Sequence, residues 1–293
     1  SITAQKGKNM KKLLSIILAL LLLTCLTGAA AAGPGGATSE LTVTKFAADG
    51  ETVLEQKTVD IPWLEANLPV QGDGVTHYYH QAPVFSDNLE ERWDSAENVT
   101  KSFKDRGAVK GTDVKDLCEL VGGMKEGDDV MIAAPDGYHV EYGYNTIYNP
   151  SERQGKAVVC WYNGEEIIGV GERQGVGYAS RDGYFLGMRL VFFADDAQNP
   201  EGKHVFGNND MRETLPEKSV YFYEGLYPST SGLTVKFISE VRVYEGGYHG
   251  ETGLLSKSMM VQTPPPTKSA SSPAALIGLL AGLGCAAYFA LRR

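Results

Sequence analysis

The sequence predicts a strand-rich α+β domain that lies between two apolar ends. Three observations lead to this class. Short segments of alternating polar and apolar residues recur between residues 40 and 262, turn-forming Gly, Asn and Asp residues separate them, and only two segments show helical spacing. This region holds roughly 220 residues, enough for the core of one domain. We therefore expect a single mixed domain over residues 40–262, in which strands outnumber helices.

The beginning of that domain predicts a hairpin followed by a short helix. Leu41–Phe46 alternates as a strand, Asp49 and Gly50 supply a turn, and Thr52–Val59 alternates back. The helix would begin after Asp60, whose side chain can cap its first turn, because a proline within that turn is compatible with a helix start.

A second helix is expected within residues 111–123. Apolar residues recur there at helical spacing, with Thr112 or Asp113 as the cap and Gly122 as the end. Val130–Ala134 follows as a compact strand, and Asp136-Gly137 turns the chain.

The strongest hairpin signal lies further along the chain. Ala157–Tyr162 and Glu165–Val170 flank an Asn163-Gly164 turn, a dipeptide typical of two-residue hairpin loops. Three further strands are expected: Met188–Phe193, Val220–Tyr223 and Leu233–Tyr244.

The N-terminal end has the parts of a secretory signal peptide. Met10 and two lysines precede the apolar run Leu13–Leu26, which is followed by small residues up to Gly33. We expect residues 10–32 to act as the signal peptide, so that the protein is exported.

The C-terminal end has the pattern of a membrane anchor. Residues 263–273 are a Pro- and Ser-rich spacer, and residues 274–291 are uncharged and apolar. As a helix this segment would span roughly 27 Å, close to the thickness of a hydrocarbon core. Arg292 and Arg293 follow it and favour a cytoplasmic C-terminus. We expect a transmembrane helix over 274–291, an ectodomain outside the cell and a cytoplasmic C-terminus.

The charge of the exported part argues against nucleic acid as a partner. Seven of the 27 lysines and arginines lie in the two ends, and all 36 acidic residues lie between them. The middle region therefore holds 20 basic and 36 acidic residues, a net charge of −16. A domain this acidic repels phosphate backbones.

Three stretches between residues 111 and 193 resemble a known family. They read GTDVKDLCELVGGMKEGDDVMIAAPDGY, VVCWYNGEEI and DGYFLGMRLVF. In this order they resemble the C-terminal half of the molybdopterin-binding domain of sulfite-oxidase-like oxidoreductases. That family has a G-x-x-L-x-D-L-L helix, a strand ending in DGY, a Y-x-x-NGE-x-L hairpin and a G-x-PLRLV strand. The resemblance implies the same mixed, strand-rich fold and a molybdopterin cofactor.

The same resemblance implies a changed active site. Family members coordinate molybdenum through a cysteine upstream of this half, within a C-x-G-N-R loop, whereas this chain has no cysteine between Cys25 and Cys118. A neutral imidazole does not replace an anionic thiolate without changing the charge of the metal site. We expect the cavity to persist without sulfite-oxidase chemistry. Cys118 and Cys160 form either a disulfide or two buried thiols; the sequence leaves both open.

The segment that falls where the family places its molybdenum loop reads His77-Tyr78-Tyr79-His80-Gln81. These five residues are the expected lining of a small-ligand or cofactor site, and His77 and His80 are the candidate metal ligands. Two histidines three residues apart can share a metal if the backbone turns, but they point to opposite faces of an extended strand. His139, His204, His249 and nearby carboxylates are candidates for the remaining ligands. Alternatively, these histidines and tyrosines satisfy backbone groups around a loop.

A second group of hydrogen-bond donors follows the RLVF strand. His204 and Arg212 belong to a Gly- and Asn-rich stretch that could meet an anion at a helix start, and we count both among the cofactor-binding candidates. A surface loop rich in turn formers explains the same residues.

Three hypotheses about function follow. The first is an exported, membrane-anchored binding domain for a small molecule or metal, with the molybdopterin-binding fold but without its catalysis. The second is a molybdopterin-dependent oxidoreductase with nonstandard metal ligation. The third is a structural or adhesive protein of the cell envelope, whose partners would be other envelope proteins. No catalytic residue is assigned, because no nucleophile, phosphate-loop or calcium-loop motif is present in the sequence.

Overall fold

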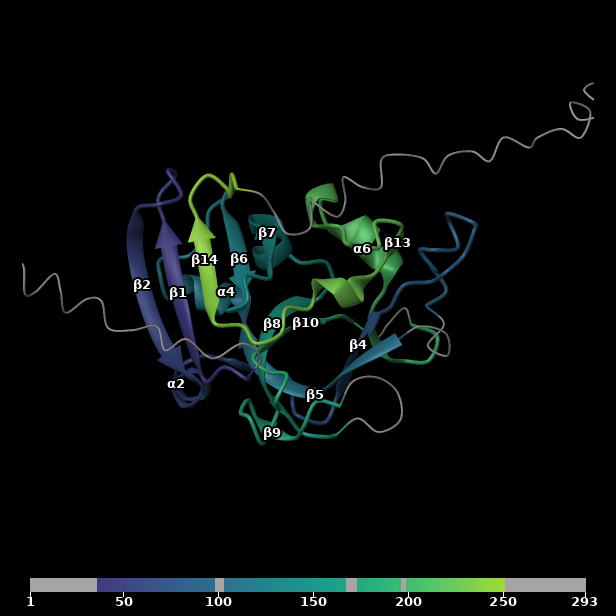
Figure 1. Cartoon of the computed structure of the whole chain (residues 1–293), viewed down its shortest axis with the longest axis horizontal. Helices are drawn as coiled ribbons and strands as arrows, with labels where there is room; N and C mark the ends of the chain where they lie inside the picture. The colour runs from purple at the N-terminus through teal and green to yellow at the C-terminus, as the bar shows by residue number, and fades with distance from the viewer. Residues whose placement is uncertain (1–35, 98–102, 167–172, 196–198, 251–293) are drawn as a thin grey trace, which may run out of the picture.

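The computed structural model describes residues 36–97, 103–166, 173–195 and 199–250 (Figure 1). Within these ranges the chain has the strand-rich α+β character that the sequence predicts. The predicted signal peptide (10–32), spacer (263–273) and anchor (274–291) lie outside the described residues. No helix in the described ranges has both the length and the apolar character needed to span a membrane.

A five-stranded mixed sheet forms one side of the molecule, in the order β2-β1-β14-β6-β7 (Figure 1). Its strands are β1 (Glu40–Phe46), β2 (Val53–Asp60), β6 (Asp129–Ala133), β7 (His139–Gly143) and β14 (Glu240–Tyr244). The predicted N-terminal hairpin is confirmed, because β1 and β2 pair in antiparallel register with Leu41 opposite Val59. β14 inserts between β1, to which it is parallel, and β6.

A second sheet of seven strands crosses the first, with the main order β10-β8-β5-β4-β11. Its strands are β3 (Val70–Gln71), β4 (His77–Gln81), β5 (Phe103–Asp113), β8 (Lys156–Asn163), β9 (Gly177–Tyr178), β10 (Arg189–Phe193) and β11 (His204–Phe206). A small two-stranded hairpin completes the strands, β12 (Phe222–Tyr223) and β13 (Tyr227–Pro228).

The helices are short. They are α2 (Ile61–Asn67), α4 (Val114–Glu119), α5 (Tyr144–Tyr148) and α6 (Asn208–Thr214), with 3₁₀ turns η1 (Glu217–Ser219) and η2 (Thr230–Leu233). Asp60 caps α2 as predicted and accepts from the Trp63 N–H at 2.9 Å. Of the two cap candidates for the second helix, Asp113 caps α4 and accepts from the Lys115 N–H at 3.0 Å, whereas Thr112 lies in β5.

One hydrophobic core lies between the two sheets. α4 sits inside it, in contact with β5 and β8 of one sheet and with β14 of the other. Trp161 is fully buried there and donates its indole N–H to the Thr112 hydroxyl at 3.0 Å. A second, smaller buried cluster on the five-stranded sheet consists of Met131, Ala133 and Tyr244, with Phe46 and Tyr248 packed against it.

Several sequence predictions need correction. Gly111 and Thr112 belong to β5 rather than to a helix, because Gly111 packs so closely on β8 that a Cβ would lie 2.3 Å from the Val159 carbonyl oxygen. β8 ends at Asn163, and Glu165 and Glu166 are not in a strand; the rest of the predicted return strand lies outside the described residues.

The predicted strands near the end of the domain are also shorter than expected. Only Phe222–Tyr223 of the first is a strand; Val220, its first predicted residue, caps the C-terminal end of η1 instead. In the second, η2 and a positive φ of 58° at Phe237 interrupt the chain before β14 begins at Glu240. The alternation of polar and apolar residues there reflects burial of an irregular segment rather than an extended strand.

Candidate functional site

The segment His77–Gln81 is the strand β4, so His77 and His80 point to opposite faces of the sheet. His77 is half-buried and lies between two carboxylates, with Nδ1 at 2.9 Å from Asp105 and Nε2 at 3.2 Å from Glu165. The hydrogen bond to Asp105, against the opposing effect of burial, raises the pKa of His77 to about 9. His77 is therefore an imidazolium near neutral pH, a form that cannot coordinate a metal.

His80 is fully buried and bonded at both ring nitrogens. Its Nε2 accepts the Phe192 backbone N–H at 3.1 Å, and its Nδ1 lies 3.2 Å from the Thr230 carbonyl oxygen. A carbonyl can only accept, so Nδ1 carries the proton. Burial, together with nearby Arg106 and Arg189, holds the pKa of His80 well below its usual value. The neutral ring thus ties β4, β10 and η2 together.

The other residues of β4 are also engaged with the protein. Tyr78 stacks on Phe193 with ring centroids 3.8 Å apart and lies 5.2 Å from His204. Gln81 donates from its amide to Asp94 and accepts from the Asn208 backbone N–H. These contacts fill the space where the sequence places a ligand cavity.

The two remaining candidates, Tyr79 on β4 and Arg212 on α6, make separate contacts. Tyr79 lies under Lys203, whose Nζ is 5.0 Å from the ring centroid. Burial raises the pKa of Tyr79 to about 12, so its hydroxyl stays protonated. Arg212 lies on α6, where it stacks over Trp93 and pairs with Glu90 at 3.0 Å. The structure therefore brings Tyr78 and His204 together but separates His77 from His80.

The cysteines and the other histidines add no metal centre in the described ranges. Cys118 and Cys160 are both free and buried, and burial raises the pKa of each thiol. His139 lies against Glu141 at 3.1 Å, on the other sheet from β4. Within the described part of the chain, no group of three or more His, Cys, Asp or Glu side chains is arranged to hold a metal ion.

Arg189 is the interior side chain best suited to hold an anion. Only 1% of it is exposed, and its guanidinium donates to the Thr234 hydroxyl at 3.0 and 3.2 Å and to the Gln174 amide oxygen at 3.4 Å. These acceptors are neutral, whereas a buried guanidinium usually pairs with a carboxylate or phosphate. These hydrogen bonds therefore provide no anionic partner for the Arg189 charge among the described residues.

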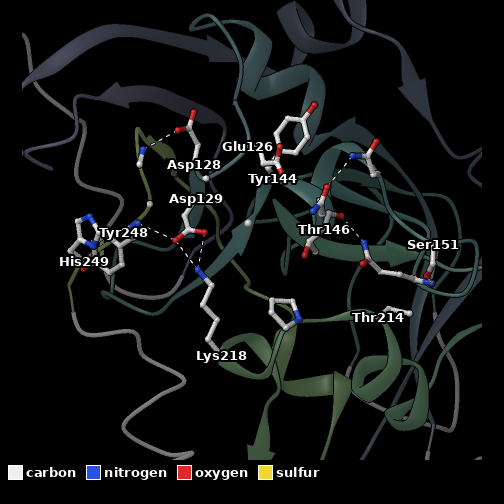
Figure 2. Close-up of a pocket in the computed structure, with 18 of the residues that line it drawn as sticks. Glu126, Asp128, Asp129, Tyr144, Thr146, Ser151, Thr214, Lys218, Tyr248 and His249 are labelled. Atoms are coloured by element: carbon white, nitrogen blue, oxygen red, sulfur yellow. Dashed lines mark hydrogen bonds and ion pairs between the residues drawn. The ribbon is translucent and has the colours of Figure 1, made fainter.

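A cleft of about 700 Å³ opens at a different place, beside the end of the five-stranded sheet (Figure 2). One wall is the start of β6, with Asp128 and Asp129, and the neighbouring helix α5. The facing wall is the segment from α6 to η1, which carries Lys218. The segment after β14, with Tyr248 and His249, closes one side. Three parts of the chain that are remote in sequence thus meet around this space.

Two adjacent carboxylates hold the walls of the cleft in position. Asp128 accepts the Gly246 N–H at 2.9 Å, and Asp129 accepts the Tyr248 N–H at 3.0 Å. Asp129 also pairs with Lys218, whose Nζ lies 2.8 Å from both carboxylate oxygens, as the dashed lines of Figure 2 show. The pair Asp128-Asp129 therefore fixes both the segment after β14 and η1.

The remaining lining combines aromatic rings with amides. Tyr144 stacks on Tyr148 at 4.7 Å between ring centroids, and Tyr248 packs against Tyr244 at 4.9 Å. A second aromatic ring therefore supports each of the two tyrosines that line the cleft. Gln154 is buried and donates to a backbone carbonyl of α5. Such a surface offers flat apolar faces next to hydrogen-bonding groups.

The charge of the cleft sets which ligands it can accept. Four carboxylates line it against one lysine: Glu126, Asp128, Asp129 and Glu213, with Lys218 as the cation. The resulting negative potential disfavours anions and favours neutral polyhydroxyl or cationic molecules. This site was not predicted from the sequence. Two features of the sequence could have indicated it: the consecutive acids Asp128 and Asp129 at the start of β6, and the Gly246-Gly247 pair after the last strand.

Comparison with known proteins leaves the family of the chain open. No protein-family model matches the sequence, and no curated protein matches it.

Proposed function

We propose that this chain is a non-catalytic binding protein, exported and anchored in the membrane with its folded domain outside the cell. Its ligand site would be the cleft beside β6, α5 and η1 (Figure 2). The observation that carries this proposal is the cleft itself, because its volume falls in the range of sites that enclose small molecules. Its rings and amides favour a neutral or cationic polar ligand, such as a saccharide or an organic amine.

The state of the reactive side chains supports binding rather than catalysis. Both described thiols are protonated and buried, and His80 has no free ring nitrogen. The sulfite-oxidase-like fold remains part of the proposal. Its support is that the resembling stretches form adjacent secondary structure: VVCWYN lies in β8, and the RLVF strand, β10, pairs directly with it.

A binding experiment tests the proposal with the full chain in detergent. Panels of saccharides and organic amines are screened by thermal shift, and hits are measured by calorimetry. We expect Tyr144→Ala to weaken a hit by up to about tenfold, because a stacked ring contributes about 0.5–1.5 kcal/mol beyond the area that it buries. Tyr223→Ala is the matched control, since this ring is 40% exposed and does not line the cleft. Equal loss in both variants, or none in either, contradicts the cleft as the binding site.

The buried Arg189 favours the second candidate, an oxidoreductase that binds an anionic, pterin-type cofactor. Its guanidinium fits a phosphate or other anion, but the surroundings do not fit the metal of such a cofactor, because His80, Gln81 and both thiols are buried and already engaged or protonated. Molybdenum and pterin analysis of the purified protein decides between the two. Stoichiometric molybdenum would overturn the binding proposal.

An exposed aromatic surface favours the third candidate, an adhesive envelope protein. Phe85 is 69% exposed and packs edge-on against Tyr223 and Tyr227 at 6.2 and 4.8 Å between ring centroids. Exposed aromatic groups are enriched where proteins bind one another. Replacing Phe85 by Ser should abolish attachment to envelope material if adhesion is the function, and leave it unchanged if the cleft alone binds.

A further inference from the structure

The outer edge of β2 is open. β2 (Val53–Asp60) is the last strand of its sheet, and no strand in the described part of the chain pairs with its free side (Figure 1). It is eight residues long, and Val53 and Leu54 are each 51% exposed. A long edge strand with exposed apolar residues is a template for pairing with another strand.

The hydrogen bonds of β1 identify the backbone groups that face outward. The Thr42 N–H donates to Ser239 next to β14, so Thr42 faces β14 and its neighbours Leu41 and Val43 face β2. Lys57 is opposite Val43 in this pairing, so Lys57 faces β1. Because strand residues alternate, the N–H and C=O groups of Gln56 and Thr58 point away from the sheet. Leu54 lies at a register irregularity, because Lys45 pairs with Glu55 but Phe46 pairs with Val53, so the regular edge begins at Glu55.

The outward-facing backbone N–H and C=O groups of β2 allow it to pair with β2 of a second copy of the chain. In an antiparallel pair across a two-fold axis at Gln56, the two Gln56 residues exchange a pair of N–H···O bonds at the centre of the interface. Because the backbone of Gln56 faces outward, the central pair is a hydrogen-bonded one.

The side chains are complementary in the same register. Glu55 lies directly opposite Lys57 of the second copy, and the symmetry gives this contact twice. Both residues occupy a non-hydrogen-bonded position, where opposing side chains approach most closely. The neighbouring registers move the axis by one residue and are less favourable: an axis at Glu55 places the two glutamates opposite each other, and an axis at Lys57 does the same with the two lysines.

We propose that β2 is a homodimer interface, at which two copies of this chain join their five-stranded sheets in antiparallel register centred on Gln56. A second copy supplies the complement to Glu55 and Lys57 at this spacing. Trp63 helps to position Lys57, whose Nζ lies 4.2 Å from the centroid of that ring. A dimer of this kind is isologous, with the same surface used by both copies. It leaves the cleft on the opposite edge of the sheet, next to β7, uncovered.

Charge reversal at the two positions tests the register. Sedimentation of the full chain in detergent measures the dimer for wild type, Glu55→Lys, Lys57→Glu and the double variant, with circular dichroism as the check on folding. Each single variant places like charges opposite each other twice and should weaken the dimer by about tenfold or more. The double variant restores opposite charges and should dimerise as wild type does.

Mixing the two single variants gives the decisive result. A chain with two lysines at these positions is complementary to a chain with two glutamates, so the mixture should form heterodimers where each variant alone is monomeric. A monomeric wild type at high micromolar concentration overturns the proposal. So does a dimer that charge reversal leaves unchanged, or a mixture that stays monomeric although both variants are folded.

Discussion

Arg153 holds together a buried group of charges, and its removal should destabilise the fold in a pH-dependent way. Its guanidinium binds Asp210 through two hydrogen bonds of 2.7 and 3.0 Å and also contacts Glu97. A further bond of 3.1 Å reaches the Asp195 carbonyl. Both carboxylate side chains are only 7% exposed. The substitution Arg153→Met keeps an unbranched side chain but leaves two buried carboxylates without their cation.

The expected loss at pH 8 is about 3–5 kcal/mol, the usual cost of removing one partner from a buried ion pair. Glu97 can relieve part of this loss by taking up a proton. Burial, and then the charge of Asp210, already raises the pKa of Glu97 to about 7 in the intact protein. A carboxyl with a raised pKa stabilises the fold fully below its unfolded pKa, and this contribution is lost as the pH rises through the folded value.

Urea unfolding of the full chain at pH 5.5 and pH 8, followed by circular dichroism, measures the effect. Without Arg153 the pKa of Glu97 rises further, so the loss should be smaller at pH 5.5 by up to about 1.4 kcal/mol per pH unit for the one proton. The control is Arg212→Met, which removes a surface pair and should cost less than about 1 kcal/mol. A loss for Arg153→Met that is below 1 kcal/mol at pH 8, or equal at both pH values, refutes the reasoning.

Three further predictions follow from local geometry. Asp105→Asn should bring the pKa of His77 down from about 9 towards its ordinary value, because the Asp105 hydrogen bond is the main cause of the shift; a midpoint that stays near 9 in a histidine NMR titration contradicts this. The stability that protonated His77 adds is complete below pH 6.5, its ordinary pKa, and is lost as the pH rises through about 9. Gly155→Ala should cost at least about 2 kcal/mol in thermal unfolding, since its Cβ would lie 1.9 Å from the Phe193 carbonyl oxygen, whereas Gly137→Ala, in open space, should cost about 1 kcal/mol. The two core thiols should resist maleimide labelling in the native protein and react only after unfolding, as read by mass spectrometry; fast native labelling would show that they are accessible.

Local signals in the sequence were sufficient where the structure is local. The turn between β1 and β2 is formed by Asp49, whose carboxylate accepts the Thr52 N–H at 2.8 Å, three residues away. Both helix caps are equally local. The strand β5 escaped notice because its charged residues mask the alternation, and it is defined by pairing with β4 and β8.

Contacts between residues remote in sequence determine the geometry of the two histidines of β4 and the position of the cleft. The spacing of His77 and His80 left two geometries open, and pairing of β4 with β5 and β11 selects the one that separates them. The cleft depends on contacts that no local pattern encodes. Asp128 and Asp129 bind backbone N–H groups 118 and 119 residues further along the chain.

The position of β14 has a consequence for how the chain reaches its native state. The Thr38 hydroxyl bonds to Ile238, 200 residues away, and β1 finds its parallel neighbour only in β14 (Figure 1). During synthesis, β1 therefore has no neighbour on its β14 side until almost the whole domain has been made. Pairing across such a sequence distance is slow because loop closure precedes any gain from contact. Acquisition of the native sheet should thus be a late event in folding.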